Sequence, residues 1–345
     1  MGLAKNYYLG RRILASNFNT PANRLPYKLI YAVTYKCNSR CTNCSIWKRE
    51  SRDELTLDEI DRFFSANPYF LWIDITGGEI FLRDDIVDIF KIISKRCKRL
   101  HTLHFPTNGL LTDKIIEKTK EIKKLGLNKL IVSVSIDGSP EIHDKIRGIK
   151  GGFERTIETY KRLKEIGGIS VYPGMTLCGE NAGFIGDTIK SIKQHDPGFS
   201  FSDLHVNVIH SSSHFYGNQK ISDYPYHEIS RVIEGFMRQK RFEISPVSFL
   251  ERSYTKRVKK YLESKSCPMP CHSLTVSAFL DPTGNVFPCT MYDRKIGNIR
   301  NSGFSDIWTG KETRKIAREI NKLKCPQCWT PCEAYQTILA NILRV

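Results

Sequence analysis

The sequence lacks the features of a membrane-spanning or secreted protein. No apolar run approaches the roughly 20 residues that a membrane-spanning helix needs, and residues 1–12 carry charge without the apolar centre of a signal peptide. We therefore expect a cytoplasmic protein. Acidic residues are also scarce, because 36 Asp and Glu stand against 53 Lys and Arg, for a net charge of +17. This excess suits an anionic partner, although most of the cations are scattered over stretches of helical pattern.

Structural disulfides are not expected in such a chain, yet it contains 11 cysteines. They fall in clusters, which favours metal ligation. Cys37, Cys41 and Cys44 lie within eight residues, and the next cysteine is Cys97. Soft thiolates select iron–sulfur clusters, zinc or Cu(I), and three of them leave one position open where four would close the site. The spacing therefore predicts a [4Fe–4S] cluster with one iron that the protein does not bind.

Strand-like and helix-like patterns alternate from residue 28 onward. We predict strands over residues 28–35, 70–76, 100–106, 129–136, 169–177 and 204–209, and helices over 56–66, 84–97, 112–125, 153–166 and 184–194. Sequential β/α units favour a parallel sheet with right-handed crossovers. We therefore predict an α/β fold, a partial (β/α)6 TIM-like barrel that is open on one side. The cysteine loop follows the first strand, at the end of the barrel that carries active sites.

The pattern Cys37-x3-Cys41-x2-Cys44 after an N-terminal strand resembles the signature of radical S-adenosylmethionine (radical SAM) enzymes. This resemblance implies the same partial barrel, a [4Fe–4S] cluster and S-adenosylmethionine bound to the open iron. It also implies reductive cleavage of that cofactor to a 5′-deoxyadenosyl radical, which abstracts hydrogen from a substrate. The chain departs from many relatives at Asn43, where they carry an aromatic residue, and Trp47 is a candidate to cover the adenine instead.

The second and third strand ends carry groups that suit a bound cofactor. Gly77, Gly78 and Glu79 resemble the family's Gly-Gly-Glu motif, whose backbone and carboxylate bind the methionine ammonium, although Ile80 replaces the usual proline. Taken alone, the motif is also explained by a tight turn. Asn108 follows the third strand in a turn-forming triplet, and the resemblance makes it a further cofactor contact.

The region after the fourth strand resembles radical SAM enzymes that have a C-terminal SPASM or twitch extension. The resemblance implies that Ser135 and Arg147 hold the carboxylate and ribose of the cofactor. Guanidinium is a permanent cation that suits bidentate contact with a carboxylate. Asp137 is expected either to reach the cofactor or to form a local turn. His143, beside Asp144, is expected to be a structural cap.

The regular alternation stops after residue 210. Helices are predicted over 225–240 and 249–262, and hairpin strands over 275–280 and 285–288. The accompanying cysteines are Cys267, Cys271, Cys289, Cys325, Cys328 and Cys332. Their layout resembles the SPASM/twitch domain, which binds auxiliary iron–sulfur clusters. We expect one auxiliary [4Fe–4S] cluster, and a second, incompletely ligated cluster is the alternative. Zinc remains open for the last three thiols.

We expect an N-terminal extension over 1–27, a radical SAM barrel over 28–210, a helical linker over 211–266 and a SPASM/twitch-like iron–sulfur domain over 267–345. The extension is expected to pack on the barrel rather than on a membrane surface, because its amphipathic pattern is weak. His205, His210 and His214, near the sixth strand, are candidates for substrate binding or proton transfer, but each is expected to be structural or solvated.

By the resemblance the protein is a radical SAM oxidoreductase or maturase-type enzyme that receives electrons from a donor such as flavodoxin or ferredoxin. A peptide or protein side chain is the first substrate prediction, and a lipid, sugar or nucleoside is the alternative. A zinc-stabilised nucleic-acid-binding protein is the rival of another class. The rival leaves residues 76–79 unexplained, and the sequence shows no groove-reading helix or aromatic RNA-binding signature.

Overall fold

The strands of the barrel form where the sequence predicts them. The computed structural model describes residues 2–18, 25–219, 226–241 and 245–344. Its first six strands are β1 (Lys28–Thr34), β2 (Trp72–Gly77), β3 (Thr102–Thr107), β4 (Lys129–Ser135), β5 (Ser170–Leu177) and β6 (His205–Val208). The five predicted helices between them are α2 (Leu57–Ala66), α3 (Ile86–Arg96), α4 (Thr112–Lys123), α6 (Gly152–Glu165) and α7 (Ile185–His195). The ends of these elements differ from the predictions by at most two residues.

One short helix of the barrel was not predicted. α5 (Pro140–Arg147) follows β4, with Pro140 in its first turn and Gly148, at φ 65°, directly after it. Its eight residues are too few for a clear helical period. A side chain at position 148 would clash, because its Cβ would lie 2.6 Å from the carbonyl oxygen of Arg40. The end of α5 therefore packs directly on the cysteine loop.

The sheet continues beyond the barrel into the C-terminal part of the chain. Its order is β6-β5-β4-β3-β2-β1-β7-β8-β9, and β1 to β6 are parallel. The added strands are β7 (Ser277–Leu280), β8 (Asn285–Phe287) and β9 (Gly297–Asn298). The predicted hairpin of β7 and β8 is confirmed. The sequence did not predict that β7 pairs in parallel with β1, which fixes the hairpin to the barrel.

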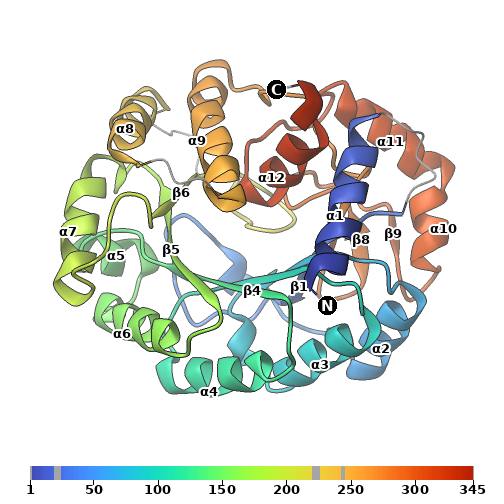
Figure 1. Ribbon diagram of the computed structural model, residues 1–345, viewed down its shortest axis with the longest axis horizontal. Coiled ribbons are helices and arrows are strands. Elements are labelled where there is room, and N and C mark those ends of the chain that lie inside the picture. The colour runs from blue at the N-terminus through green and yellow to red at the C-terminus, as the bar shows by residue number, and fades with distance from the viewer. Residues whose placement is uncertain (1, 19–24, 220–225, 242–244, 345) are drawn as a thin grey trace.

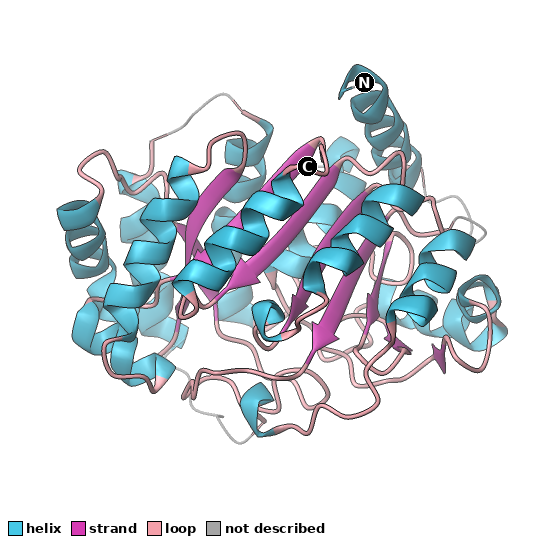
Figure 2. Ribbon diagram, turned by 90° about the horizontal axis from the view of Figure 1, so that it is seen from below, coloured by secondary structure: helices cyan, strands magenta, loops and turns pink. Residues whose placement is uncertain are grey.

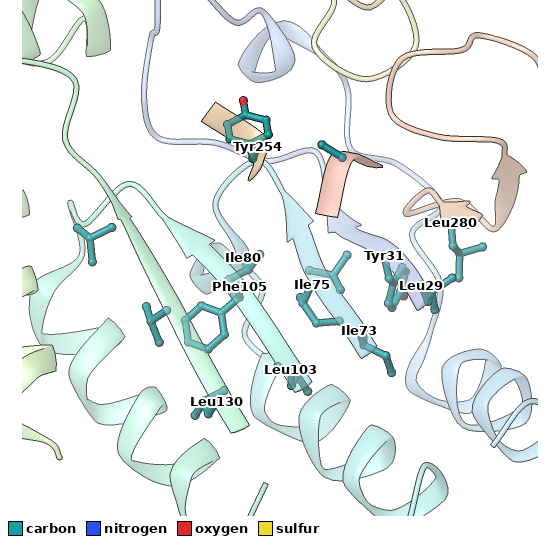
Figure 3. Packing of buried hydrophobic residues seen from close by; sticks show 14 of the residues in the cluster. Leu29, Tyr31, Ile73, Ile75, Ile80, Leu103, Phe105, Leu130, Tyr254 and Leu280 are labelled. Atoms are coloured by element: carbon teal, nitrogen blue, oxygen red, sulfur yellow. The ribbon is translucent and has the colours of Figure 1, made fainter. Parts of the chain in front are cut away.

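Alternate strand residues face two different environments. In β1, Leu29 and Tyr31 belong to the main apolar core under the outer helices, whereas Ile30 and Ala32 belong to a separate cluster. Figure 3 shows Leu29 with the corresponding residues of the neighbouring strands in the main core. All of β1 is buried, as is typical of a parallel strand that is covered on both faces.

Two of the C-terminal helices, α9 (Pro246–Ser264) and α12 (Pro331–Ala340), cover the side of the barrel that the sheet leaves open. The other C-terminal helices of the described residues are α8 (Tyr226–Gln239), α10 (Phe304–Thr309) and α11 (Lys311–Asn321). The Tyr254 hydroxyl of α9 donates to Asn207 of β6 at 3.0 Å, and Lys28 of β1 donates to Gln336 of α12 at 2.9 Å. In Figure 1, α9 and α12 lie on the side opposite α3 and α4. The two helices thus connect the first and last barrel strands.

The N-terminal extension is mainly helical. In α1 (Gly2–Asn17), Tyr8, Leu9 and Ile13 pack against apolar residues that directly precede β1, β2 and β7. This packing places α1 at the amino-terminal ends of the strands, opposite the cysteine loop. No helix in the described part of the chain combines the length and the apolar character that crossing a membrane requires.

Candidate functional site

Three cysteine side chains share one wall of a large cavity. Cys37, Cys41 and Cys44 follow β1 and line a cavity of about 560 Å³, which runs from the carboxyl ends of the strands into the barrel. Three backbone hydrogen bonds of 2.8–2.9 Å hold this loop, from Arg40 to Arg147, from Thr42 to Ile146 and from Ser45 to Tyr216. The loop is therefore fixed by α5 on one side and by the segment after β6 on the other.

The surroundings of these sulfurs fit a metal cluster. Burial raises the pKa of Cys37 to about 11 and that of Cys44 to about 12. The thiols therefore need a cationic centre beside them in order to ionise, and iron supplies one. The Asn108 amide lies 4.0 Å from the Cys37 sulfur, and an Arg147 nitrogen lies 3.8 Å from the Cys41 sulfur. Three soft donors in one loop, with polar groups beside them, match a [4Fe–4S] cluster that keeps one iron open.

Two glycines let the end of β2 lie against the segment that leads into the cysteine loop. A Cβ atom at Gly77 would lie 2.2 Å from the carbonyl oxygen of Thr34, and one at Gly78 would lie 2.1 Å from that of Lys36. Gly77 also has a φ of 145°, which side chains rarely adopt. Both residues line the cavity. The two glycines thus allow close backbone packing that places the end of β2 beside the segment that leads to Cys37.

Glu79 acts within the protein framework rather than on the cavity wall. Its carboxylate is buried and accepts hydrogen bonds from the Thr107 hydroxyl at 3.0 Å and from the Asn108 backbone at 2.7 Å. Burial raises its pKa to about 7, against the opposing effect of these donors. Asn108 itself lines the cavity, so Glu79 fixes the loop that presents Asn108. The contact of Glu79 with the methionine ammonium stays a prediction.

Arg147 is held above the cysteine loop by a buried carboxylate. Its Nη2 lies 2.6 Å from the Asp137 carboxylate, which also accepts a hydrogen bond from the Thr176 backbone at 2.9 Å. Burial acts to lower the pKa of Arg147, but the Asp137 charge raises it above its ordinary value. The Nε of Arg147 is a buried donor without a partner among the described residues. Arg147 and Ser135 both line the cavity, so the guanidinium and the hydroxyl fit a cofactor carboxylate or ribose.

The structure also places the residues that were expected to be structural. His143 is buried and accepts a hydrogen bond from the Asp137 backbone at 3.2 Å, while Asp144 accepts one from the Phe153 backbone at 2.8 Å at the start of α6. His210 is buried between the Val208 carbonyl and the Trp329 backbone amide. These contacts tie loops together and leave the chemistry to other groups.

A layer of polar side chains inside the barrel was missed by the sequence analysis. Lys28 lies 2.9 Å from Asp74, whose carboxylate lies 3.3 Å from His104. His104 in turn lies 2.9 Å from the Ser133 hydroxyl. Although burial opposes ionisation of Asp74, the charge of Lys28 and the hydrogen bond with His104 hold its pKa below the usual range. Polar residues at alternate positions of otherwise apolar strands are the signal that points to such a layer.

The opposite wall of the barrel continues this polar layer. His205 lies 3.3 Å from the Glu251 carboxylate of α9, and its ring stacks on Tyr172 with 4.3 Å between the centroids. Both His205 and Glu251 line the cavity, together with Trp72 from β2. The cavity therefore runs from the cysteine loop to an interior surface of imidazole, carboxylate and aromatic groups.

Five of the six C-terminal cysteines surround a second cavity: Cys267, Cys271, Cys289, Cys325 and Cys328. They come from the segment before β7, the end of the hairpin and the loop before α12. Burial, together with the neighbouring thiols, raises the pKa of Cys271 and of Cys328 well above the usual value. Four thiolates hold one [4Fe–4S] cluster, so this set suits a single auxiliary cluster.

Cys332 lies apart from these five thiols. It lines the first cavity, whereas the next residue, Glu333, lines the second. α12 begins at Pro331, and successive helical residues point about 100° apart. The Glu333 Oε1 is buried without a partner among the described residues, and burial raises the pKa of this carboxyl to about 7.

The last three thiols, for which zinc was also considered, do not gather at one cavity. Cys325 and Cys328 line the second cavity, whereas Cys332 lines the first. Within the described ranges, no group of three or more His, Cys, Asp or Glu side chains is arranged to hold a single metal ion.

Comparison with known families agrees with this geometry. Residues 31–192 match the Radical SAM superfamily, and residues 271–333 match SPASM, an iron–sulfur cluster-binding domain. The chain is 26% identical over 343 residues to the antilisterial bacteriocin subtilosin biosynthesis protein AlbA of Bacillus subtilis, covering 92% of this chain and 70% of that protein. It is also 26% identical over 321 residues to an AdoMet-dependent heme synthase of Methanosarcina barkeri, covering 87% and 86%.

Solved structures share the fold at low sequence identity. SuiB of Streptococcus suis bound to the precursor peptide SuiA aligns with a TM-score of 0.62 and 14% identity, over 97% of this chain and 76% of that chain. The enzyme anSMEcpe with bound AdoMet and the Cp18Cys peptide aligns with a TM-score of 0.61 and 16% identity, over 93% and 98%. The predicted fold class, a partial α/β barrel with a cysteine-rich C-terminal domain, is confirmed.

Proposed function

Because the chain belongs to the radical SAM superfamily and carries a SPASM domain, we propose that it modifies a peptide or protein side chain inside its barrel. The radical SAM domain binds a [4Fe–4S] cluster and S-adenosylmethionine, and the SPASM domain binds an iron–sulfur cluster. When bound, the first cluster and the cofactor supply a 5′-deoxyadenosyl radical that takes a hydrogen atom from the substrate.

The residues around the first cavity have distinct proposed roles. Cys37, Cys41 and Cys44 bind the cluster, and their positions on one cavity wall support this. The strand end at Gly77 and Gly78, which lines the cavity, presents its backbone to the cofactor.

The cofactor itself is held by side chains from three other strand ends. Arg147, oriented by Asp137, uses its guanidinium for the cofactor carboxylate or ribose. Ser135 and Asn108 complete this surface. Glu79 contributes by holding Asn108, and hence indirectly.

A single observation carries the substrate proposal. The cavity passes from the cysteine loop to the His205–Glu251 pair and the Tyr172 ring, and α9 and α12 cover its side. A side chain inserted from a peptide reaches a region shielded from water, where a radical is protected from side reactions. The relative AlbA acts in bacteriocin biosynthesis, and SuiB was solved with a precursor peptide. The same chemistry on a lipid, sugar or nucleoside is the alternative. The relative named as a heme synthase supports a small-molecule substrate of this alternative kind.

The C-terminal domain supports this function with one auxiliary [4Fe–4S] cluster, held by four of the five thiols at the second cavity.

We further infer that the enzyme works in the cytoplasm, where thiols stay reduced and where flavodoxin or ferredoxin is available as the electron donor. The division into segments 1–27, 28–210, 211–266 and 267–345 is part of this proposal. The net charge of +17 suits an acidic donor or substrate.

Deuterium transfer tests the substrate class directly. The anaerobically reconstituted protein is incubated with S-adenosylmethionine, dithionite and small peptides encoded beside its gene, prepared with deuterated side chains. We expect deuterium to appear in 5′-deoxyadenosine and the peptide to lose that deuterium from one residue. Transfer only from deuterated lipids, sugars or nucleosides would instead establish the alternative. A protein that retains its iron but produces no 5′-deoxyadenosine under any condition contradicts the proposal as a whole.

A further inference from the structure

A row of exposed apolar side chains runs along α1. Six large apolar side chains stand out as exposed in the described part of the chain, and Tyr7, Leu14 and Phe18 lie on or directly after this helix. Their spacing of seven and four residues places them within about 40° of one helix face. A fourth, Leu343, lies beside the same helix, since its backbone donates to Asn17 at 3.0 Å. Exposed apolar groups gathered in this way mark an interaction surface.

The inner face of α1 does not explain this row. Leu9 and Ile13 line the cavity and, with Tyr8, pack on the amino-terminal ends of the strands. Figure 2 shows the helix that bears the N-terminus standing out beyond the rest of the molecule. Apolar residues on two opposite faces also account for the weak amphipathic pattern in the sequence. In the described part of the chain the row on the opposite side is exposed, so it is available for a different contact.

Cations surround the row, and α1 contains no acidic residue. Arg11 is exposed on the same face, 5.8 Å from the centre of the Tyr7 ring. Arg99, also exposed, lies 4.3 Å from the centre of the Tyr8 ring. Aromatic and aliphatic groups among arginines are typical of helices that lie in the interface of an anionic bilayer. Pairing with a second copy of this chain would bring these cations against one another, which opposes a dimer through this face.

We propose that the outer face of α1, formed by Tyr7, Arg11, Leu14 and Phe18, binds the surface of an anionic lipid bilayer. The contact is peripheral and reversible. Because α1 lies at the amino-terminal ends of the strands, the bilayer contacts the end of the barrel opposite the cysteine loop. The loop consequently stays accessible to an electron donor and to substrate while the protein is bound. The proposal does not depend on the proposed substrate, since it rests on the surface of α1 alone.

Vesicle flotation tests the proposal with the full-length, cluster-loaded protein. Vesicles of phosphatidylglycerol and phosphatidylcholine in equal amounts are compared with pure phosphatidylcholine, at low salt and in 0.5 M NaCl. We expect binding to the anionic vesicles, little to the neutral ones, and weakening by salt. Arg11→Glu and Arg99→Glu should each weaken binding at least about fivefold, and the triple variant Tyr7→Ser, Leu14→Ser, Phe18→Ser at least about tenfold.

A matched control distinguishes vesicle binding by this surface from nonspecific binding by other exposed aromatic residues. Phe184 and Phe249 are also exposed, at 44% and 39%, but neither belongs to α1. The double variant Phe184→Ser, Phe249→Ser should bind anionic vesicles like the unaltered protein. Iron content and circular dichroism establish that each variant is folded. The proposal is overturned if the folded triple variant binds as well as the unaltered protein, if anionic vesicles bind none of it, or if the triple variant instead converts a dimer to a monomer.

Discussion

The two groups of cysteines are assembled in different ways. Cys37, Cys41 and Cys44 share one loop of eight residues, so little chain entropy is needed to bring them together. The second cavity collects its thiols from three separate segments, which meet only after β7 pairs with β1 and α12 packs on α9. The first group is local in the sequence, and the second is a product of tertiary structure.

This difference in assembly predicts different roles for the two sites. A three-thiol loop at the mouth of a large cavity leaves room for a cofactor and a substrate. The second site has five thiols around a small, buried cavity. A cluster bound there is enclosed by protein and joins segments that are distant in sequence. Binding at the second site therefore contributes free energy of folding, whereas binding at the first mainly supplies chemistry.

The largest expected effect separates the two sites completely. Replacing Cys37, Cys41 and Cys44 together with Ala should abolish 5′-deoxyadenosine formation under dithionite. Iron should fall from about eight atoms per chain to about four, because the auxiliary cluster remains. Liquid chromatography of the products and iron analysis measure both quantities. Product formation by the triple variant would contradict the assignment of the first site.

Removing thiols from the second site should lower the stability of the fold. The double variant Cys325→Ala, Cys328→Ala leaves three thiols at the second cavity, so we expect loss of auxiliary iron and a fall in apparent Tm of about 10 °C or more. Cys332→Ala is the matched control, and it should retain the iron because Cys332 lines the other cavity. Loss of auxiliary iron in Cys332→Ala would instead show that Cys332 is a ligand and that the helix start reorients on binding.

The fold and the first site could be predicted because their signals are local. Alternating periods define the six strands, and the cysteine loop follows the first of them in sequence. The short helix α5 was missed because eight residues give too little periodicity. The pairing of β7 with β1 was missed because it joins strands separated by more than 240 residues, and no local pattern encodes such a partner.

The role of Glu79 shows a different limit of sequence analysis. Its motif predicts a contact with the cofactor, but a motif does not encode which protein groups bind the side chain in the folded chain. The structure directs the carboxylate to Thr107 and Asn108, away from the cavity. The polar layer from Lys28 to Ser133 was missed for the opposite reason, since its members form no motif and meet only when the barrel closes.

A smaller effect tests whether the first site holds its cofactor through a guanidinium. Arg147→Lys keeps the positive charge, but lysine has a single side-chain nitrogen. That nitrogen cannot contact Asp137, the cysteine loop and a ligand at the same time. We expect the affinity for S-adenosylmethionine to fall about 30-fold, as measured by calorimetry on cluster-loaded protein. Arg155→Lys, at an exposed position of α6, is the control and should leave it unchanged. Unaltered affinity in Arg147→Lys would remove Arg147 from the site.

The smallest effect compares one buried carboxyl from each site. Burial raises the pKa of Glu79 and of Glu333 to about 7. Between the unfolded pKa, about 4.5, and about 7, the folded state holds more protons than the unfolded state, so stability falls as pH rises through this window. The unaltered protein should therefore lose about 3–5 °C more of apparent Tm between pH 5 and 7.5 than a Glu→Gln variant at either position.

The two Gln variants should nevertheless differ at pH 7.5. Glu79 accepts hydrogen bonds on both oxygens, and an amide nitrogen there would face the donors of Thr107 or Asn108, so Glu79→Gln gains little stability. Glu333 has one oxygen without a partner among the described residues, so Glu333→Gln removes a buried charge without losing a hydrogen bond there and should raise the Tm. Equal shifts in both variants would mean that hydrogen bonding does not distinguish the two sites. The two sites would then differ in how their thiols are brought together, but not in how their buried carboxyls are hydrogen-bonded.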